Sequence, residues 1–227
     1  MLDTKGKIIR AKIKLGKEQP FFAMLLSYLT IREAKNGELP FPTMGVSDKG
    51  LMIYAPEFVE SLNEEELKGV LLHETMHLAL SHLLRVCERS REVWNIAGDI
   101  IINNMLINEK FQLPKDGIIP TNNQGKLEPY NLTIKDINKK NADVIYDEIY
   151  SKIPKMKIRM VGMGQANGKG EGVPSWDSHI YTEKGDKQKD GETEANEKEW
   201  NKRLVEAGTY ARMRGQLPKG MEEMIGD

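Results

Sequence analysis

Residues 73–77, His-Glu-Thr-Met-His, place two histidines four residues apart, with a glutamate directly after the first. In a helix, residues four apart lie on one face, one turn from each other. Two imidazoles in that arrangement can hold one tetrahedral Zn²⁺ ion. Glu74 projects about 100° around the helix from His73, so it can reach a water on the ion without binding the ion. The spacing predicts a hydrolytic zinc site with His73 and His77 as ligands and Glu74 as general base.

The residues around this motif are uncharged, as a buried catalytic helix requires. Leu71 and Leu72 precede the motif, and Leu78 and Ala79 follow it. The competing interpretation is a pair of core histidines held by hydrogen bonds. Leucine would fill such a core without the desolvation cost of an imidazole, so we favour the metal site.

A catalytic zinc needs a third protein ligand, and the chain has four histidines, at positions 73, 77, 82 and 179. His82 follows His73 by nine residues, about 900° of rotation, which is the opposite face of a straight helix. It also follows His77 by five residues, whereas the pattern HExxHxxGxxH needs six and a glycine. We interpret His82 as a cation near the end of the helix; His82 and His179 stay open as alternative ligands.

Asp99 is the preferred third ligand. It lies in the apolar run WNIAGDIIIN (residues 94–103), where a buried carboxylate needs a partner such as a metal ion. Two antiparallel helices joined by a short loop would return Asp99 toward His77. Asn103 follows one turn later and is placed to hydrogen-bond a metal ligand. A capping or solvent-facing aspartate is the competing interpretation.

Two helices are expected to position these side chains. Asn63 with Glu66 three residues later has the spacing of a capping box, which predicts a helix over 64–86. Apolar residues at helical spacing predict a second helix over 91–108. Shorter patterns predict helices near 5–16, 21–26, 143–150 and 193–214, strands at 28–32, 43–47 and 51–54, and a long loop over 109–140.

These elements predict an α+β fold with a small mixed or antiparallel sheet in the N-terminal half. We expect a core over 1–160, a flexible Gly/Lys/Glu-rich segment over 161–195 that is a lid, a plug or a linker, and a C-terminal helix in 196–227 that packs on the core. His179 lies in the middle segment. We expect it to be a catalytic oxyanion donor or a further metal ligand delivered by a lid, or else a surface histidine.

Composition limits the class of protein. The chain has 33 Lys and Arg against 34 Asp and Glu, so it lacks the overall basic excess typical of a nucleic-acid binder. A single cysteine, Cys87, rules out an intrachain disulfide. The sequence has neither an apolar run long enough to span a bilayer nor a signal peptide. We expect a cytoplasmic protein without nucleic-acid or membrane partners.

The HETMH motif followed by WNIAGDIIIN resembles a predicted metal-dependent peptidase domain family that is usually found upstream of a von Willebrand factor A-like domain. The stretches QPFF (19–22), LMIYAPEF (51–58), ADVIY (142–146) and WDSH (176–179) also fit. The resemblance implies a zincin-like fold, with Zn²⁺ on His73, His77 and Asp99 and with Glu74 as base. In zincins the strand before the active-site helix is usually an edge strand that pairs with an extended peptide. Residues 51–54 are the candidate for that strand, and 43–47 are the alternative.

The leading hypothesis is therefore a zinc metallopeptidase acting on a peptide or protein substrate. The first alternative is a non-catalytic peptide- or protein-binding module on a zincin scaffold with a structural zinc. The second is hydrolysis of a non-peptide amide by the same residues. The sequence specifies neither the substrate nor the oligomeric state.

Overall fold

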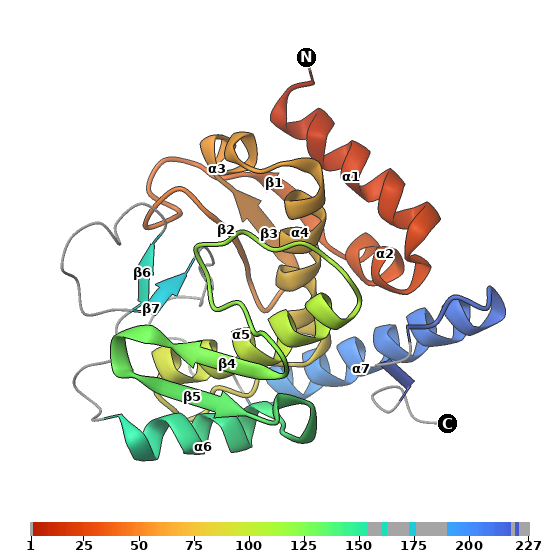
Figure 1. Cartoon of the computed structure of the whole chain (residues 1–227). Coiled ribbons are helices and arrows are strands. Elements are labelled where there is room, and N and C mark those ends of the chain that lie inside the picture. The colour runs from red at the N-terminus through yellow and green to blue at the C-terminus, as the bar shows by residue number, and fades with distance from the viewer. Residues whose placement is uncertain (1, 154–159, 163–172, 176–189, 219–220, 223–227) are drawn as a thin grey trace.

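The computed structural model describes residues 2–153, 160–162, 173–175, 190–218 and 221–222. Helices and strands alternate along the chain, so the fold is α+β as expected (Figure 1). The elements are α1 (Thr4–Glu18), α2 (Pro20–Ser27), β1 (Thr30–Glu33), β2 (Met44–Val46), β3 (Leu51–Tyr54), α3 (Pro56–Ser61), α4 (Glu64–Ala79), α5 (Arg91–Asn108), β4 (Gln124–Leu127), η1 (Glu128–Tyr130), β5 (Leu132–Lys135), η2 (Ile137–Lys139), α6 (Ala142–Lys152), β6 (Met160–Gly162), β7 (Val173–Ser175) and α7 (Asp190–Met213).

A three-stranded mixed sheet forms in the N-terminal half, in the order β1-β3-β2. β1 runs parallel to β3, and β2 runs antiparallel to it. Residues 51–54 therefore form the central strand, and the expectation that they form the edge strand was wrong. The alternative, residues 43–47, contains β2, which is an edge of this sheet among the described strands. Pairing on both sides of β3 depends on residues distant in sequence, which local patterns do not reveal.

Two apolar clusters make up the core, and α5 contributes to both. Ile102 and Leu106 belong to a cluster built from α1, α2, the sheet, α4 and α7. Ile96 and Ile100 belong to a second cluster with the β4–β5 hairpin and α6. In Figure 1, α5 accordingly lies between α4 and the layer formed by β4, β5 and α6. Asp99 lies on α5 between Ile96 and Ile100, two members of the second cluster.

The β4–β5 hairpin occupies part of the region predicted to be a long loop, and that prediction was wrong. Its strands are antiparallel, with Gly125 opposite Ile134. Both strands alternate between buried and more exposed positions. Gly125 lies against Ile100, where an added Cβ would be 3.3 Å from the Ile100 side chain. The hairpin thus covers the side of α5 that faces away from α4.

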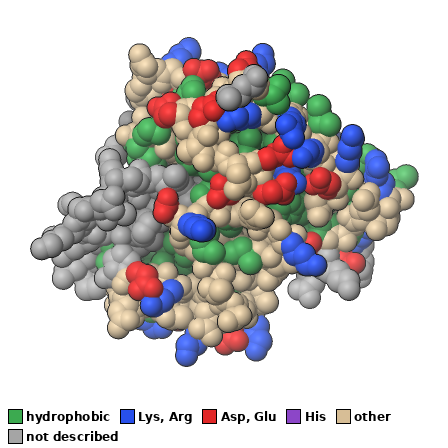
Figure 2. Space-filling model, turned by 45° about the horizontal axis from the view of Figure 1, so that its top comes forward, with side chains coloured by type: hydrophobic (Ala, Val, Ile, Leu, Met, Phe, Trp, Pro, Cys, Tyr) green, Lys and Arg blue, Asp and Glu red, His purple; other side chains and the backbone are tan. Residues whose placement is uncertain are grey.

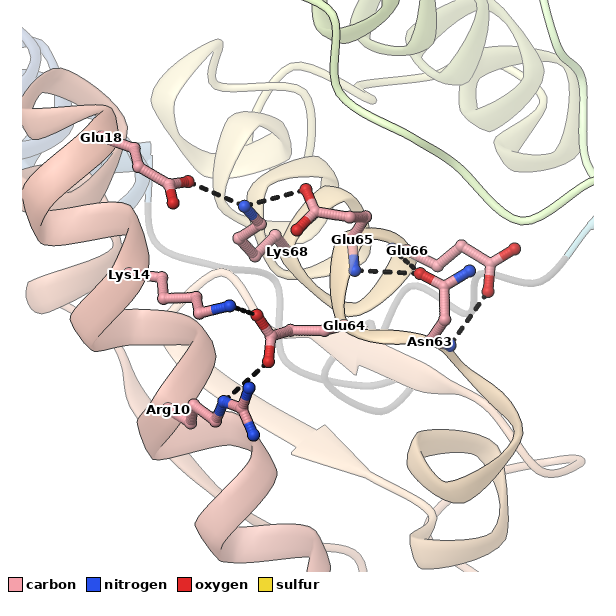
Figure 3. A network of polar contacts seen from close by, with 8 residues as sticks. All are labelled: Arg10, Lys14, Glu18, Asn63, Glu64, Glu65, Glu66 and Lys68. Atoms are coloured by element: carbon pink, nitrogen blue, oxygen red, sulfur yellow. Dashed lines mark hydrogen bonds and ion pairs between the residues drawn. The ribbon is translucent and has the colours of Figure 1, made fainter.

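The predicted capping box at the start of α4 is confirmed (Figure 3). The side-chain oxygen of Asn63 accepts hydrogen bonds from the backbone N–H groups of Glu65 and Glu66. The Glu66 carboxylate accepts one in return from the Asn63 N–H. Three backbone N–H donors at the start of the helix are satisfied in this way, which fixes where α4 begins.

Ion pairs hold the first turns of α4 against α1 (Figure 3). The Glu64 carboxylate pairs with Arg10 and Lys14 of α1. The Lys68 ammonium, which is almost fully buried, pairs with Glu18 of α1 and also with a glutamate of its own helix. A buried cation needs such partners because desolvation without them is costly. The helix that carries the HETMH motif is therefore fixed both by its cap and by its neighbour.

The molecular face in Figure 2 carries Lys, Arg, Asp and Glu side chains intermixed, as the near-zero net charge would produce. Among the described residues, no histidine is visible on this face, which agrees with the burial of His73, His77 and His82. Within the same described ranges, none of the helices combines the length and apolar character that a bilayer crossing requires.

Candidate metal centre

The two histidines of the HETMH motif lie on one face of α4 and are both fully buried. Their ring centroids are 4.6 Å apart. The Nε2 atom of His77 lies 2.9 Å from the Nε2 atom of His73. The expected placement of both imidazoles on one helix face is thus present, with a nitrogen of each ring directed toward the same point.

Asp99 brings a carboxylate from α5 to that point. Its Oδ1 atom lies 3.3 Å from Nε2 of His77 and 3.7 Å from Nε2 of His73. The Asp99 side chain is only 6% exposed. His73, His77 and Asp99 each offer one ligand atom, and these atoms all lie within 4.8 Å of one another. Two imidazole nitrogens and a carboxylate oxygen that converge in a buried place form a set that a shared cation can stabilise.

The dimensions of this group fit a tetrahedral zinc ion. With ligand bonds of about 2.0–2.2 Å, tetrahedral geometry places the ligand atoms about 3.3–3.6 Å from one another. The three measured separations, 2.9, 3.3 and 3.7 Å, straddle that range. Two imidazoles and one carboxylate are also a donor set found in catalytic zinc sites. The residues present could therefore hold the ion with small side-chain adjustments.

Asn103 determines which nitrogen of His73 is available to a metal. Its side-chain N–H group donates to the carbonyl oxygen of Ile118 at 2.8 Å, so the amide oxygen must face His73. That oxygen lies 2.7 Å from Nδ1 of His73. Since an amide oxygen only accepts, Nδ1 carries the proton and Nε2 presents a lone pair toward His77 and Asp99. The predicted hydrogen bond between Asn103 and a candidate ligand is confirmed, with the Asn103 oxygen as acceptor.

Glu74 follows His73 on α4 and is fully buried. The helical rotation of about 100° per residue carries its side chain to one side of the His73–His77 row. A carboxylate beside a metal site, but outside the ligand group, can exchange a proton with water bound there. The position of Glu74 on α4 is compatible with the role predicted for it.

His82 lies beside His77, and the expectation that it would occupy the opposite helix face was wrong. α4 ends at Ala79, well before the predicted residue 86, because Ser81 adopts a left-handed conformation with φ 56°. The chain then turns, and the backbone N–H of His82 donates to the His77 carbonyl at 2.8 Å. The two rings are 5.4 Å apart. Even so, His82 is not part of the group whose ligand atoms converge.

Gly98 allows these two rings to lie close to α5. A Cβ atom at this position would lie 2.8 Å from Nδ1 of His82 and 3.3 Å from Cε1 of His77. This role of Gly98 was not predicted from the sequence. The available signal was a glycine inside a helix, which costs about 1 kcal/mol relative to alanine and therefore calls for a packing reason.

Comparisons with known proteins agree with a metal-dependent hydrolase. A family model described as "Putative metallopeptidase domain" matches residues 4–227, almost the whole chain. A Thermotoga maritima protein named "Uncharacterized protein" is 29% identical over 116 residues, which are 48% of this chain and 28% of the relative. The match thus spans little more than a quarter of that relative's length. No solved structure gives a significant match.

His179, predicted as an oxyanion donor or further ligand, lies outside the described residues. Its role stays a prediction.

Proposed function

The chain belongs to the putative metallopeptidase domain family, and from this premise we propose that it is a zinc-dependent peptidase with a zincin-like catalytic core. His73, His77 and Asp99 hold the ion, and Glu74 is the general base. The observation that carries the proposal is the convergence of two imidazole Nε2 atoms and a carboxylate oxygen at 2.9–3.7 Å. The substrate is a peptide or an unfolded segment of a protein.

Zinc bound here would lower the pKa of a coordinated water toward 7 and would polarise a substrate carbonyl. The protein residues then carry the proton transfers. Glu74 accepts the proton from the attacking water and delivers it to the amine that leaves. Asn103 keeps the His73 ring in one tautomer and one orientation throughout.

The outer edge of β2 is our candidate for aligning the substrate. The Thr43 carbonyl and the Ser47 N–H both hydrogen-bond toward β3. In an antiparallel pair this direction alternates along the strand, so the backbone groups of Met44 and Val46 point to the other side. β2 also packs against α4, which carries the metal ligands. An extended peptide added to this edge would pass beside the metal centre and would be held through its backbone.

A second candidate function follows from burial. His73, Glu74 and His77 all have zero exposed surface, and closed metal sites are typical of structural zinc, whereas catalytic sites keep an open position. The alternative is therefore a peptide- or protein-binding module in which the zinc stabilises the contact between α4 and α5. A chain of this kind would bind zinc but would not cleave peptides.

The experiment that separates these functions is a cleavage assay with zinc-loaded protein and a chemically unfolded protein substrate, with the products detected by mass spectrometry. Glu74→Gln should retain the metal and lose activity by at least ~100-fold. Glu57→Gln, which removes an exposed acid of α3, should keep full activity. Zinc binding without any cleavage by the wild type would favour the binding module. Equal activity in the two variants would refute Glu74 as base.

A further inference from the structure

A cavity lies on another side of α5 from the metal centre. It is bounded by α5, the turn after α4, η2, the start of α6 and Met221, and its volume is about 530 Å³. That volume is typical of cavities that bind small molecules or a few peptide residues. His82 lines it, and the His82 ring is 5.4 Å from the His77 ring. The cavity and the metal centre are therefore separated by one side chain.

One face of α5 points to the metal centre and a different face lines the cavity. Asp99 and Asn103, one turn apart, face the metal centre. The residues of α5 that line the cavity recur at the spacing of a single helix face: Ile101, Asn104, Met105 and Asn108. From Ile101 to Glu109 this wall is about 12 Å long, at 1.5 Å per residue. An extended peptide of three or four residues has the same length.

Side-chain amides form the polar part of the cavity. The N–H groups of Asn104 and Asn108 donate to one oxygen, Oδ1 of Asn138, at 2.6 and 3.3 Å. These bonds use one N–H of each of two amides and the oxygen of the third. Among the described residues, the oxygens of Asn104 and Asn108 and the side-chain N–H group of Asn138 are left to meet a ligand. A chain that alternates N–H and C=O groups, as a peptide backbone does, complements this set.

Charged side chains of both signs line the cavity. Glu109 follows the last turn of α5, whereas the Arg85 guanidinium lies 5.8 Å from the Trp94 ring in the first turn. Arg85 pairs with Asp143 and Lys140 pairs with Glu148. Each of these carboxylates also binds a second cation, Arg89 or Lys152, as its partner. The cations outnumber the acids in these pairs, so Arg85 and Lys140 can still attract an anion.

We propose that this cavity binds a short peptide with free termini. The peptide carboxylate lies beside Arg85 and Lys140, and its amino group lies near Glu109. Its backbone hydrogen-bonds to the asparagine amides, and apolar side chains pack on Leu80 and Met105. The inference rests on the cavity residues alone and does not require the metal centre to be catalytic.

The test is isothermal titration of the chelator-treated Glu74→Gln chain with the peptide Leu-Ala-Ala-Leu, so that binding is measured without cleavage. The free peptide should bind with a dissociation constant below about 1 mM. Acetylating and amidating its ends should weaken binding roughly tenfold, because both charged contacts are lost.

Lys140→Gln should weaken binding roughly three- to fivefold. This variant should fold, because Glu148 keeps its second partner, Lys152. Lys139→Gln is the matched control, since Lys139 is exposed and does not line the cavity. Absence of binding up to about 10 mM peptide, equal affinity for free and blocked peptides, or equal effects of the two lysine variants would each overturn the proposal.

Discussion

Replacing Asn103 by leucine should weaken zinc binding far more than replacing its neighbour Asn104. Both asparagines are buried on α5. Asn103 joins the Ile118 carbonyl to the candidate ligand His73, whereas Asn104 donates to Asn138, away from the metal centre. The pair of variants therefore separates the role of one hydrogen bond from the general cost of changing a buried amide.

The magnitudes follow from these contacts. Asn103→Leu leaves the Nδ1–H group of His73 and the carbonyl of Ile118 buried without their partner, at a cost of about 1–3 kcal/mol for each group. We expect the metal-free chain to lose about 2–6 kcal/mol of unfolding free energy. Without the bond that fixes the tautomer of His73, zinc affinity should fall about 10- to 100-fold. Asn104→Leu should cost about 1 kcal/mol, because its partner Asn138 is exposed.

Two measurements keep stability and affinity apart. Urea unfolding of the chelator-treated variants gives the unfolding free energy, and competition with a chromophoric chelator gives the zinc dissociation constant. Asn103→Leu should raise that constant by at least ~10-fold relative to Asn104→Leu. Equal zinc affinity in the two variants would refute the claim that Asn103 orients a metal ligand, whatever the stability data show.

Gly98→Ala should destabilise the chain by about 1–3 kcal/mol and weaken zinc binding, because the new methyl group meets the His82 ring. Gly16→Ala is the control, because an added Cβ there meets nothing within 4 Å. Calorimetry should find an unchanged or higher melting temperature for this variant. An equal fall in melting temperature in the two variants would contradict the packing argument. In the loop before β2, the hydrogen bond from Arg32 lowers the pKa of Glu38 from 4.5 to about 2. The stabilising effect of ionised Glu38 should be complete above pH 4.5 and disappear as pH falls toward 2. The unfolding free energies of wild type and Glu38→Gln should therefore converge over that interval. A difference that stays constant with pH would contradict this prediction.

The helices that carry the candidate site were predictable because their signals are local. Asn63 and Glu66 satisfy each other's backbone donors, so the start of α4 is encoded within four residues. The second helix was predicted over 91–108, the bounds that α5 has. Helical spacing alone puts Asp99 and Asn103 on one face of α5. In the structure both side chains lie next to the histidines of α4.

The end of α4 was not predictable in this way. No glycine or proline follows Ala79 before residue 90, yet Ser81 takes a left-handed conformation, and His82 turns back toward His77. Packing decides this break: the Trp94 side chain donates to the His82 carbonyl at 2.7 Å. The β4–β5 hairpin was missed for a related reason, since its four-residue strands gain their buried positions only by lying on α5.

The central claim is that His73, His77 and Asp99 together hold one zinc ion. Its most direct test is elemental mass spectrometry of protein supplied with zinc and then dialysed, for the wild type, Asp99→Ala and the control Asp116→Ala, which removes an exposed acid. We expect about one zinc per chain in the wild type and the control, with marked loss in Asp99→Ala. Equal zinc content in all three proteins would mean that the third ligand is another residue, such as His82 or His179. Absence of zinc from the wild type would contradict the metal centre itself.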